Sequence, residues 1–179
     1  MRPRIYLAGA IRDGNTYDYL WREWATEHLS PYAEVLNPLN GKRLGEDKVW
    51  RAHGMVVSDA SYLVPRDMAM IRSADMIVAN LLPITSGYPC MGTLMELGMA
   101  LDRGILVVLA GPPEIVAHPF LQRVAYARFD DIYDAMTFAA KDLQVMQGWN
   151  SALPGSGSSI PDIRGGAGRT IGGEWDARV

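Results

Sequence analysis

The sequence predicts an α/β fold, a parallel sheet of five strands with helices on both faces, and two observations lead to it. Apolar segments of strand length alternate with helical patterns along the first 146 residues, which is the order that βαβ units produce. These segments are nearly continuous apolar runs, which indicates strands covered on both faces. The expected architecture is therefore a doubly wound sheet in the flavodoxin-like order 2-1-3-4-5.

Five segments have the length and composition of buried strands. They cover residues 5–9, 33–36, 76–82, 105–110 and 127–129. The fourth consists almost entirely of Ile, Leu and Val, which is typical of a strand without a solvent-exposed face.

The segments between the strands carry helix signals. They predict helices over residues 15–31, 65–74, 92–103, 119–124 and 131–146. Asn15 or Thr16 can cap the first helix. Pro65 suits the start of the second helix because its missing N–H needs no partner there, and Gly104 suits the end of the third.

Two segments fall outside this alternation. Residues 39–58 are polar and aperiodic, and this is long for a connection inside a compact domain, so a functional or mobile loop is expected. After residue 146 the composition changes to Gly, Ser and Pro, which predicts a domain over residues 1–146 and a tail over residues 147–179. If the tail lies against a neighbouring subunit, its anchors are Trp149, Ile160, Ile163 and Trp175.

Composition excludes several classes of function. A chain of 179 residues with 49% hydrophobic residues supports one core, and a net charge of -3 leaves no broad cationic surface for nucleic acid or an anionic membrane. The single cysteine excludes an internal disulfide, and neither a metal nor an organic cofactor is signalled. With no signal peptide and no apolar run of about 18 residues, we expect a cytoplasmic protein whose partners are small molecules.

Ligands of open parallel sheets bind beyond the carboxyl ends of the strands, where the strand order reverses. Three segments converge there: residues 6–14, residues 80–96 and the helix that carries Asp67. Glu96 and Asp67 are both expected in the first turn of a helix, where an acidic residue often does no more than complement the helix dipole, and Tyr6 alone would be a core tyrosine. Together, two carboxylates and a tyrosine suit a retaining glycosyl transfer, in which one carboxylate attacks the anomeric carbon.

Three motifs of this chain resemble those of the nucleoside 2-deoxyribosyltransferases. They read IYLAG at residues 5–9, RDMAMIRSADMIVAN at 66–80 and GTLMELGMA at 92–100, and the resemblance spans about residues 4–130. The third motif is the most specific. Lysine-decarboxylase-like phosphoribohydrolases share a Gly-Thr-x-x-Glu segment, but they lack the Asp67 motif and have a second glycine where Met91 stands.

The resemblance implies a role for each candidate. Glu96 corresponds to the nucleophile that forms a deoxyribosyl ester, Tyr6 to the residue that orients it, and Asp67 to the acid that engages the departing base. Substrate-binding roles are expected for residues of two of these segments, 6–14 and 80–96: Gly9, Arg12, Asn80, Cys90, Gly92 and Thr93. Members of the family generally assemble as oligomers, so at least a dimer is expected.

Related deoxynucleotide N-hydrolases have a first turn that reads Gly-Ser-Ile-Arg-Gly-Gly, which is close to residues 9–14 here. Arg12 would then hold a 5′-phosphate, or it is a surface arginine paired with Asp13. Cys90 stands where transferases commonly have aspartate and the hydrolases serine, and Ala10 replaces another serine of the hydrolases.

Three functions follow from these features. Transfer of the sugar to a second base is the leading hypothesis, hydrolysis of a nucleoside or its 5′-monophosphate is the alternative, and a non-catalytic nucleotide sensor is the third. The identity of the base and the choice between ribose and 2′-deoxyribose stay open.

Overall fold

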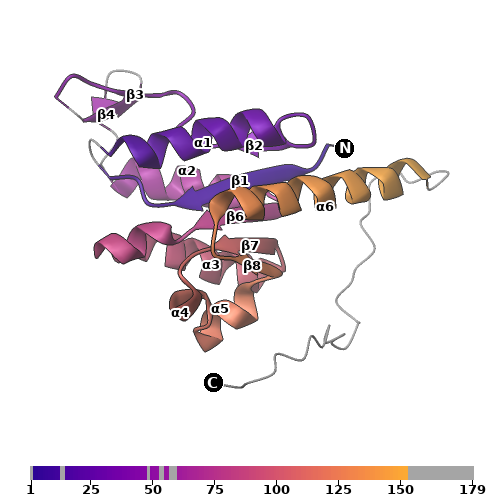
Figure 1. Ribbon diagram of the computed structural model, residues 1–179. Helices are drawn as coiled ribbons and strands as arrows, with labels where there is room; N and C mark the ends of the chain where they lie inside the picture. Colours follow the sequence, from indigo (N-terminus) through magenta and orange to yellow (C-terminus); the bar gives the residue numbers. More distant parts are fainter. Residues whose placement is uncertain (1, 13–14, 48, 53–54, 57–59, 153–179) are drawn as a thin grey trace.

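The computed structural model describes residues 2–12, 15–47, 49–52, 55–56 and 60–152. Its main sheet contains β1 (Arg4–Gly9), β2 (Glu34–Leu36), β6 (Met76–Asn80), β7 (Leu106–Ala110) and β8 (Ala127–Phe129), all parallel. The strand order is β2-β1-β6-β7-β8, which confirms the predicted order 2-1-3-4-5 (Figure 1). After β2 the chain returns to the other side of β1 and forms β6 there. The strand order therefore reverses between β1 and β6, and the ligand site is expected at their carboxyl ends.

The helices form one layer on each face of this sheet, as Figure 1 shows. Helices α1 (Thr16–Leu29) and α6 (Ile132–Ala152) cover one face. The other face is covered by α2 (Ala60–Arg72), α3 (Met91–Arg103), α4 (Pro113–Val116) and α5 (Pro119–Val124). Successive strand residues point to opposite layers: Leu7 packs with α1 and α6, whereas Tyr6 and Ala8 pack with α2 and α3.

Local sequence explains where several elements begin and end. The Asn15 side chain accepts hydrogen bonds from the backbone N–H groups of Tyr17 and Asp18, so it caps α1 as predicted. Gly104 ends α3 with a φ of 68°, a left-handed conformation that glycine accepts without strain. A short 3-10 helix, η1 (Leu82–Ser86), follows β6 and was not predicted.

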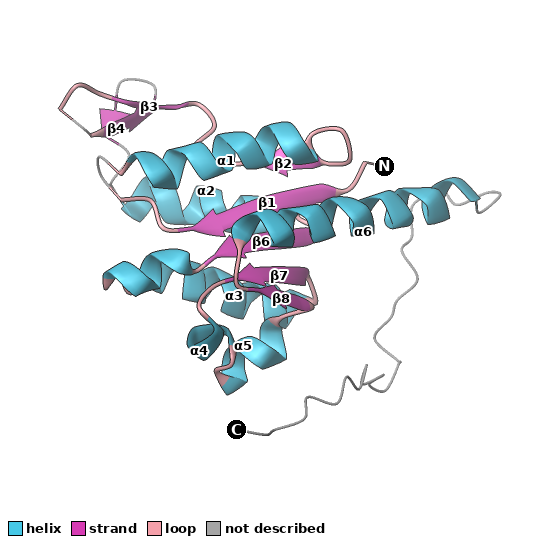
Figure 2. Cartoon of the chain, viewed as in Figure 1, coloured by secondary structure: helices cyan, strands magenta, loops and turns pink. Residues whose placement is uncertain are grey.

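The segment over residues 39–58, expected to be a functional or mobile loop, contains regular secondary structure. Strands β3 (Lys42–Leu44), β4 (Trp50–Ala52) and β5 (Met55–Val56) form a small antiparallel sheet within it. In Figure 2 this sheet is drawn on the side of the molecule to which the β1 arrow points. Strands of two or three residues are too short to show a hydrophobic period, which is why the sequence pattern did not reveal them.

Three of the differences between observed and predicted helix boundaries concern the candidate site or the tail. Helix α2 begins at Ala60, so Pro65 and Asp67 lie inside it rather than in its first turn. Helix α3 begins at Met91, which places Glu96 in the second turn. Helix α6 continues to Ala152, beyond the expected boundary at residue 146, and it includes the backbone of residue 149. The other expected tail anchors, at positions 160, 163 and 175, lie outside the described residues.

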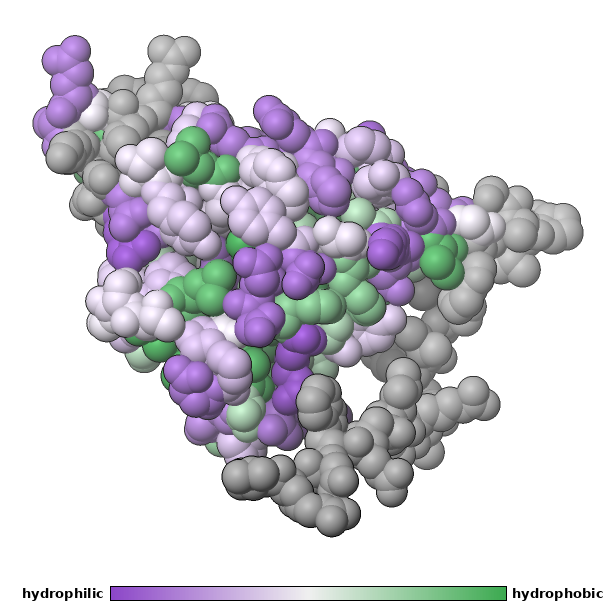
Figure 3. Space-filling model, viewed as in Figure 1, coloured by the Kyte–Doolittle hydropathy of each residue, from purple (hydrophilic) through white to green (hydrophobic). Residues whose placement is uncertain are grey.

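Figure 3 shows one face of the molecule, on which hydrophobic side chains lie scattered among hydrophilic ones. No helix in the described part of the chain combines the length and apolar composition that a membrane crossing needs.

Truncating a leucine in the sheet is predicted to cost far more stability than truncating one on the surface. Leu109 in β7 is fully buried, whereas Leu20 in α1 is 53% exposed. We expect Leu109→Ala to lower the free energy of unfolding by about 2–5 kcal/mol, because it removes buried methyl groups and leaves a cavity. Leu20→Ala should change it by about 0.5 kcal/mol or less. Urea unfolding monitored by circular dichroism measures both, and equal losses would contradict the assigned core.

Candidate functional site

A hydrogen bond joins the two candidates that lie furthest apart in sequence. The Tyr6 hydroxyl donates to Glu96 Oε1 over 2.8 Å. Tyr6 belongs to β1 and is 1% exposed, and Glu96 belongs to α3, which packs on the same face of the sheet. The carboxylate therefore lies beside Tyr6, on the face of the sheet that α2 and α3 cover.

Burial controls the ionisation of this pair. It raises the pKa of Glu96 to about 7, against the lowering effect of the Tyr6 hydrogen bond, and the nearby charge of Asp67 raises it further. Burial, and then the charge of Glu96, also raise the pKa of Tyr6 well above its usual range, so the hydroxyl remains a donor. Because Glu96 is not in the first turn of α3, a dipole role at the helix end does not apply to it.

Asp67 brings a second carboxyl group to this site from helix α2. Its Oδ1 atom is buried and has no hydrogen-bond partner. Burial raises its pKa, while the charges of Lys42, Arg66 and Arg22 lower it. The structure thus brings the three predicted catalytic candidates together, although Asp67 lies in the interior of its helix rather than in its first turn.

Arg22 is a buried component of the site that the sequence analysis missed. This α1 residue is 0% exposed, and its guanidinium donates to the carbonyl oxygens of Gly9, Ala10 and Asp18 at 2.6–3.0 Å. Burial lowers its pKa to about 10, so it remains a cation at neutral pH. In the sequence it occupies a helical pattern among other charged residues, which does not distinguish a buried arginine from a solvated one.

Gly9 allows this arginine to approach the end of β1. A Cβ atom at this position would lie 3.0 Å from Trp21 Cζ2 and 3.2 Å from Arg22 Nη2. A side chain would therefore push the first turn of the site away from α1. This packing accounts for the glycine, and its expected contact with substrate stays a prediction.

Arg12 is held by other residues of the protein. It forms an ion pair with Asp18 at 2.7 Å, and Asp18 Oδ2 also accepts from Arg12 Nε and from its backbone N–H, both over 2.8 Å. Its Nη1 donates to Ser86 Oγ over 3.1 Å, and the guanidinium lies 5.5 Å from the ring centroid of Tyr88. Arg12 thus connects the turn after β1 to the segment before α3. The alternative partner, Asp13, lies outside the described residues.

The remaining substrate-binding candidates lie between the last residue of β6 and the first turn of α3. Asn80 is fully buried; its Oδ1 accepts from the backbone N–H of Leu82 over 3.0 Å, and its amide donates to the Tyr17 hydroxyl over 3.4 Å. Cys90 is buried at the start of α3 with a left-handed φ of 47°, and burial raises the pKa of its thiol. Gly92 is exposed in the first turn of α3, whereas Thr93 is buried there.

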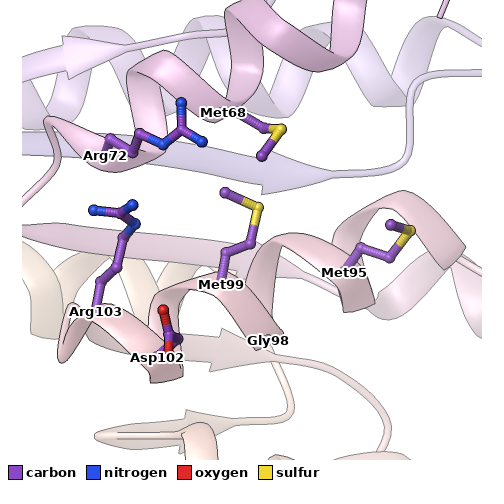
Figure 4. A pocket seen from close by; sticks show the side chains of 7 residues that line it. All are labelled: Met68, Arg72, Met95, Gly98, Met99, Asp102 and Arg103. Carbon is purple, nitrogen blue, oxygen red and sulfur yellow. The ribbon is translucent and has the colours of Figure 1, made fainter.

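A separate groove of about 470 Å³ lies between α2 and α3. Figure 4 shows side chains from the two helices facing one another across it. The groove is lined by Met68, Arg72, Met95, Gly98, Met99, Asp102 and Arg103. Neither Glu96 nor Asp67 lines it, so it is distinct from the candidate site. Among the described residues, no group of three His, Cys, Asp or Glu side chains is placed to hold a metal ion.

Comparisons with known proteins were made on sequence and on structure. A family model described as nucleoside 2-deoxyribosyltransferase matches residues 5–115, more than half of the chain. A 2-deoxyribosyltransferase from Bacillus psychrosaccharolyticus has a TM-score of 0.57 and 19% identity, over 78% of this chain and 95% of that chain. This likeness supports the fold. No curated protein matches the sequence.

Two further solved structures are similar at a lower level. A 2-desoxiribosyltransferase from Leishmania mexicana has 22% identity and a TM-score of 0.46, over 61% of this chain and 64% of that chain. A conserved protein from Enterococcus faecalis V583 has 14% identity and a TM-score of 0.47, over 83% of this chain and 99% of that chain.

The raised pKa of Glu96 predicts a measurable effect of pH on stability. Between the pKa of an unfolded glutamate, about 4.3, and its folded pKa of about 7, the folded state holds the extra proton. The stabilisation that Glu96 contributes is therefore complete below the unfolded pKa of about 4.3 and is lost as pH rises through the folded pKa of about 7. The loss is on the order of 3 kcal/mol.

Glu96→Gln removes the titrating group and keeps an acceptor for the Tyr6 hydroxyl. We expect the variant to be more stable than the parent protein at pH 8 and the difference to shrink towards pH 5. Urea unfolding of both proteins across this range measures it, and a difference that does not vary with pH would contradict the assigned burial of Glu96.

Proposed function

Because the chain belongs to the nucleoside 2-deoxyribosyltransferase family, we propose that it cleaves the N-glycosidic bond of a deoxynucleoside and transfers the sugar to a second base. The proposal rests on the hydrogen-bonded pair of Tyr6 and Glu96 with Asp67 facing it. A buried carboxylate oriented by a tyrosine is suited to attack on an oxocarbenium-like carbon.

In the first step, a Glu96 carboxylate oxygen attacks C1′ of the sugar. The bond from C1′ to the base nitrogen breaks, its electron pair goes to the base, and a proton from Asp67 neutralises the base. The Tyr6 hydrogen bond occupies Oε1, and no described residue donates to Oε2, which makes Oε2 the attacking atom. Burial raises the pKa of Asp67, so its carboxyl group keeps a proton to higher pH than an exposed aspartate does.

The second step reverses these events with a new base. A ring nitrogen of the acceptor attacks C1′, the ester bond to Glu96 breaks, and its electron pair returns to the carboxylate. The proton of the acceptor nitrogen passes to Asp67, which restores the starting state. The enzyme returns to its starting state, and the two steps balance without an external reductant.

The surroundings of Arg12 favour a nucleoside over a 5′-monophosphate as substrate. Asp18 neutralises its charge by a bidentate ion pair, so a phosphate would have to compete with a carboxylate already in place. Ala10 and Cys90 supply no hydroxyl for such a group. Hydrolysis of a nucleotide is therefore the alternative function. A non-catalytic nucleotide sensor would not need the hydrogen bond between Tyr6 and Glu96.

The central prediction is that the protein exchanges bases through Glu96. With a deoxynucleoside and a second free base, we expect the exchanged nucleoside by chromatography. Glu96→Ala should reduce its rate by about a thousandfold or more, because the nucleophile is lost. Intact-protein mass spectrometry after brief exposure to substrate should detect a sugar adduct that the variant lacks.

Glu114→Ala is the matched control for this experiment, because Glu114 is an exposed residue of α4 outside the site. It should keep full activity. Release of free sugar at the same rate with and without the acceptor would overturn transfer in favour of hydrolysis. Full activity of Glu96→Ala would overturn the proposed nucleophile.

Tyr6→Phe is predicted to shift the pH dependence of the reaction. The Tyr6 hydrogen bond lowers the pKa of Glu96, so its loss moves that pKa above the value of about 7. Since Glu96 must be ionised to attack, the acid limb of the kcat/KM profile should move from near pH 7 to higher pH. Initial rates from pH 5 to 9 measure this shift, and superimposable profiles for both proteins would refute the role given to Tyr6.

A further inference from the structure

Lys42, the first residue of β3, follows a tightly bonded turn. Asn37 Oδ1 accepts from the backbone N–H of Leu39 over 2.9 Å, and the Asn37 carbonyl accepts from Asn40 N–H over 3.0 Å. The Lys42 N–H then donates to the Leu39 carbonyl over 2.9 Å, and Gly41 has a φ of 76°. The position of the lysine backbone is therefore set by the turn.

Arg66 holds this turn against helix α2. Its Nη1 donates to the Pro38 carbonyl over 2.9 Å and its Nη2 to the Asn40 carbonyl over 2.6 Å. Arg66 immediately precedes Asp67 in the same helix. The contact therefore places the start of β3 next to the part of α2 that carries Asp67, and the charges of Lys42 and Asp67 act on each other.

Four charged groups on three helices lie near enough for their charges to act on Lys42: Arg22 of α1, Arg66 and Asp67 of α2, and Glu96 of α3. Burial lowers the pKa of Lys42, and the two carboxylates oppose this effect. Nevertheless, no described residue forms an ion pair or a hydrogen bond with the Lys42 ammonium.

Asp67 Oδ1 is likewise buried and lacks a hydrogen-bond partner. Charged and polar groups that are withdrawn from water without a partner are costly. Lys42 and Asp67 thus lie close enough for their charges to interact, but they do not pair with each other. A ligand that bonds to both would satisfy them.

We propose that Lys42 and Asp67 together bind the nucleobase, and that this pair selects 6-oxopurines over adenine. This inference rests on the proposed function, which brings a base to Asp67. An ammonium group only donates hydrogen bonds, and a protonated carboxyl group donates one. A 6-oxopurine presents two neighbouring acceptors, O6 and N7, whereas adenine presents an amino donor beside N7. Lys42 would therefore meet an acceptor in the first base and a donor in the second.

The same contact assists the departure of the base. When the C1′–N bond breaks, its electron pair enters the purine ring, and negative charge develops on O6 as well as on the ring nitrogens. Asp67 transfers its proton to N7 while the Lys42 ammonium remains charged and stabilises O6 through its hydrogen bond. A fixed positive charge at a site of developing negative charge lowers the barrier.

The test compares two substrates that differ only at position 6, deoxyinosine and deoxyadenosine, with one common acceptor base. We expect the parent protein to favour deoxyinosine in kcat/KM by about tenfold or more. Lys42→Met should bring the ratio close to one, mainly by slowing deoxyinosine. Lys42→Arg keeps a donor and should keep most of the preference. Lys141→Met, which alters an exposed lysine of α6, should leave both rates unchanged.

Binding of free hypoxanthine and free adenine to Glu96→Gln protein, measured by calorimetry, separates this inference from the proposed function. Hypoxanthine should bind more tightly, and Lys42→Met in the same background should remove the difference. If the parent protein shows no turnover but this selective binding persists, the proposed function fails and the base site stands.

Three results would overturn the base site. The first is equal binding of hypoxanthine and adenine. The second is an equal loss of kcat/KM for deoxyinosine and deoxyadenosine in a Lys42→Met protein whose melting temperature is unchanged. The third is turnover restricted to pyrimidine nucleosides.

Discussion

The hydrogen bond from the Tyr6 hydroxyl to Glu96 Oε1 connects the sheet to helix α3, and the candidate site depends on it. Strand β1 is paired on both sides, so the tyrosine is held by the sheet itself. The carboxylate consequently lies in a buried position at the reversal point of the strand order. Its ionisation near neutral pH follows from that burial, since the hydrogen bond offsets only part of the cost of the charge.

Two cations, Arg22 and Lys42, act on both Glu96 and Asp67, and the structure holds them in different ways. Arg22 donates to three backbone carbonyl oxygens and is enclosed by α1 and the end of β1, so its charge is a permanent part of the scaffold. Lys42 is positioned by its backbone, while its ammonium has no partner among the described residues. One cation supports the fold of the site, and the other is available to a ligand.

Family membership establishes the class of enzyme, and the residues around the pair distinguish this chain within that class. The turn after β1 keeps an arginine, but Asp18 and Ser86 already occupy its donors. Cys90 fills a buried position at the start of α3. The small antiparallel sheet of β3, β4 and β5, in a segment expected to be a loop, contributes Lys42, whose charge acts on both carboxylates.

The sequence by itself determined the order of the main sheet, because continuous apolar strands separated by helices permit few arrangements. It also identified Tyr6, Asp67 and Glu96 through motifs that resemble a known family. The tertiary structure decided the helix boundaries around Glu96 and Asp67 and the strands of residues 42–56, whose hydrophobic pattern is too short to read. It alone decided that Arg22 is buried and that the charges of Lys42 and Asp67 act on each other, since burial and charge proximity arise from segments distant in sequence.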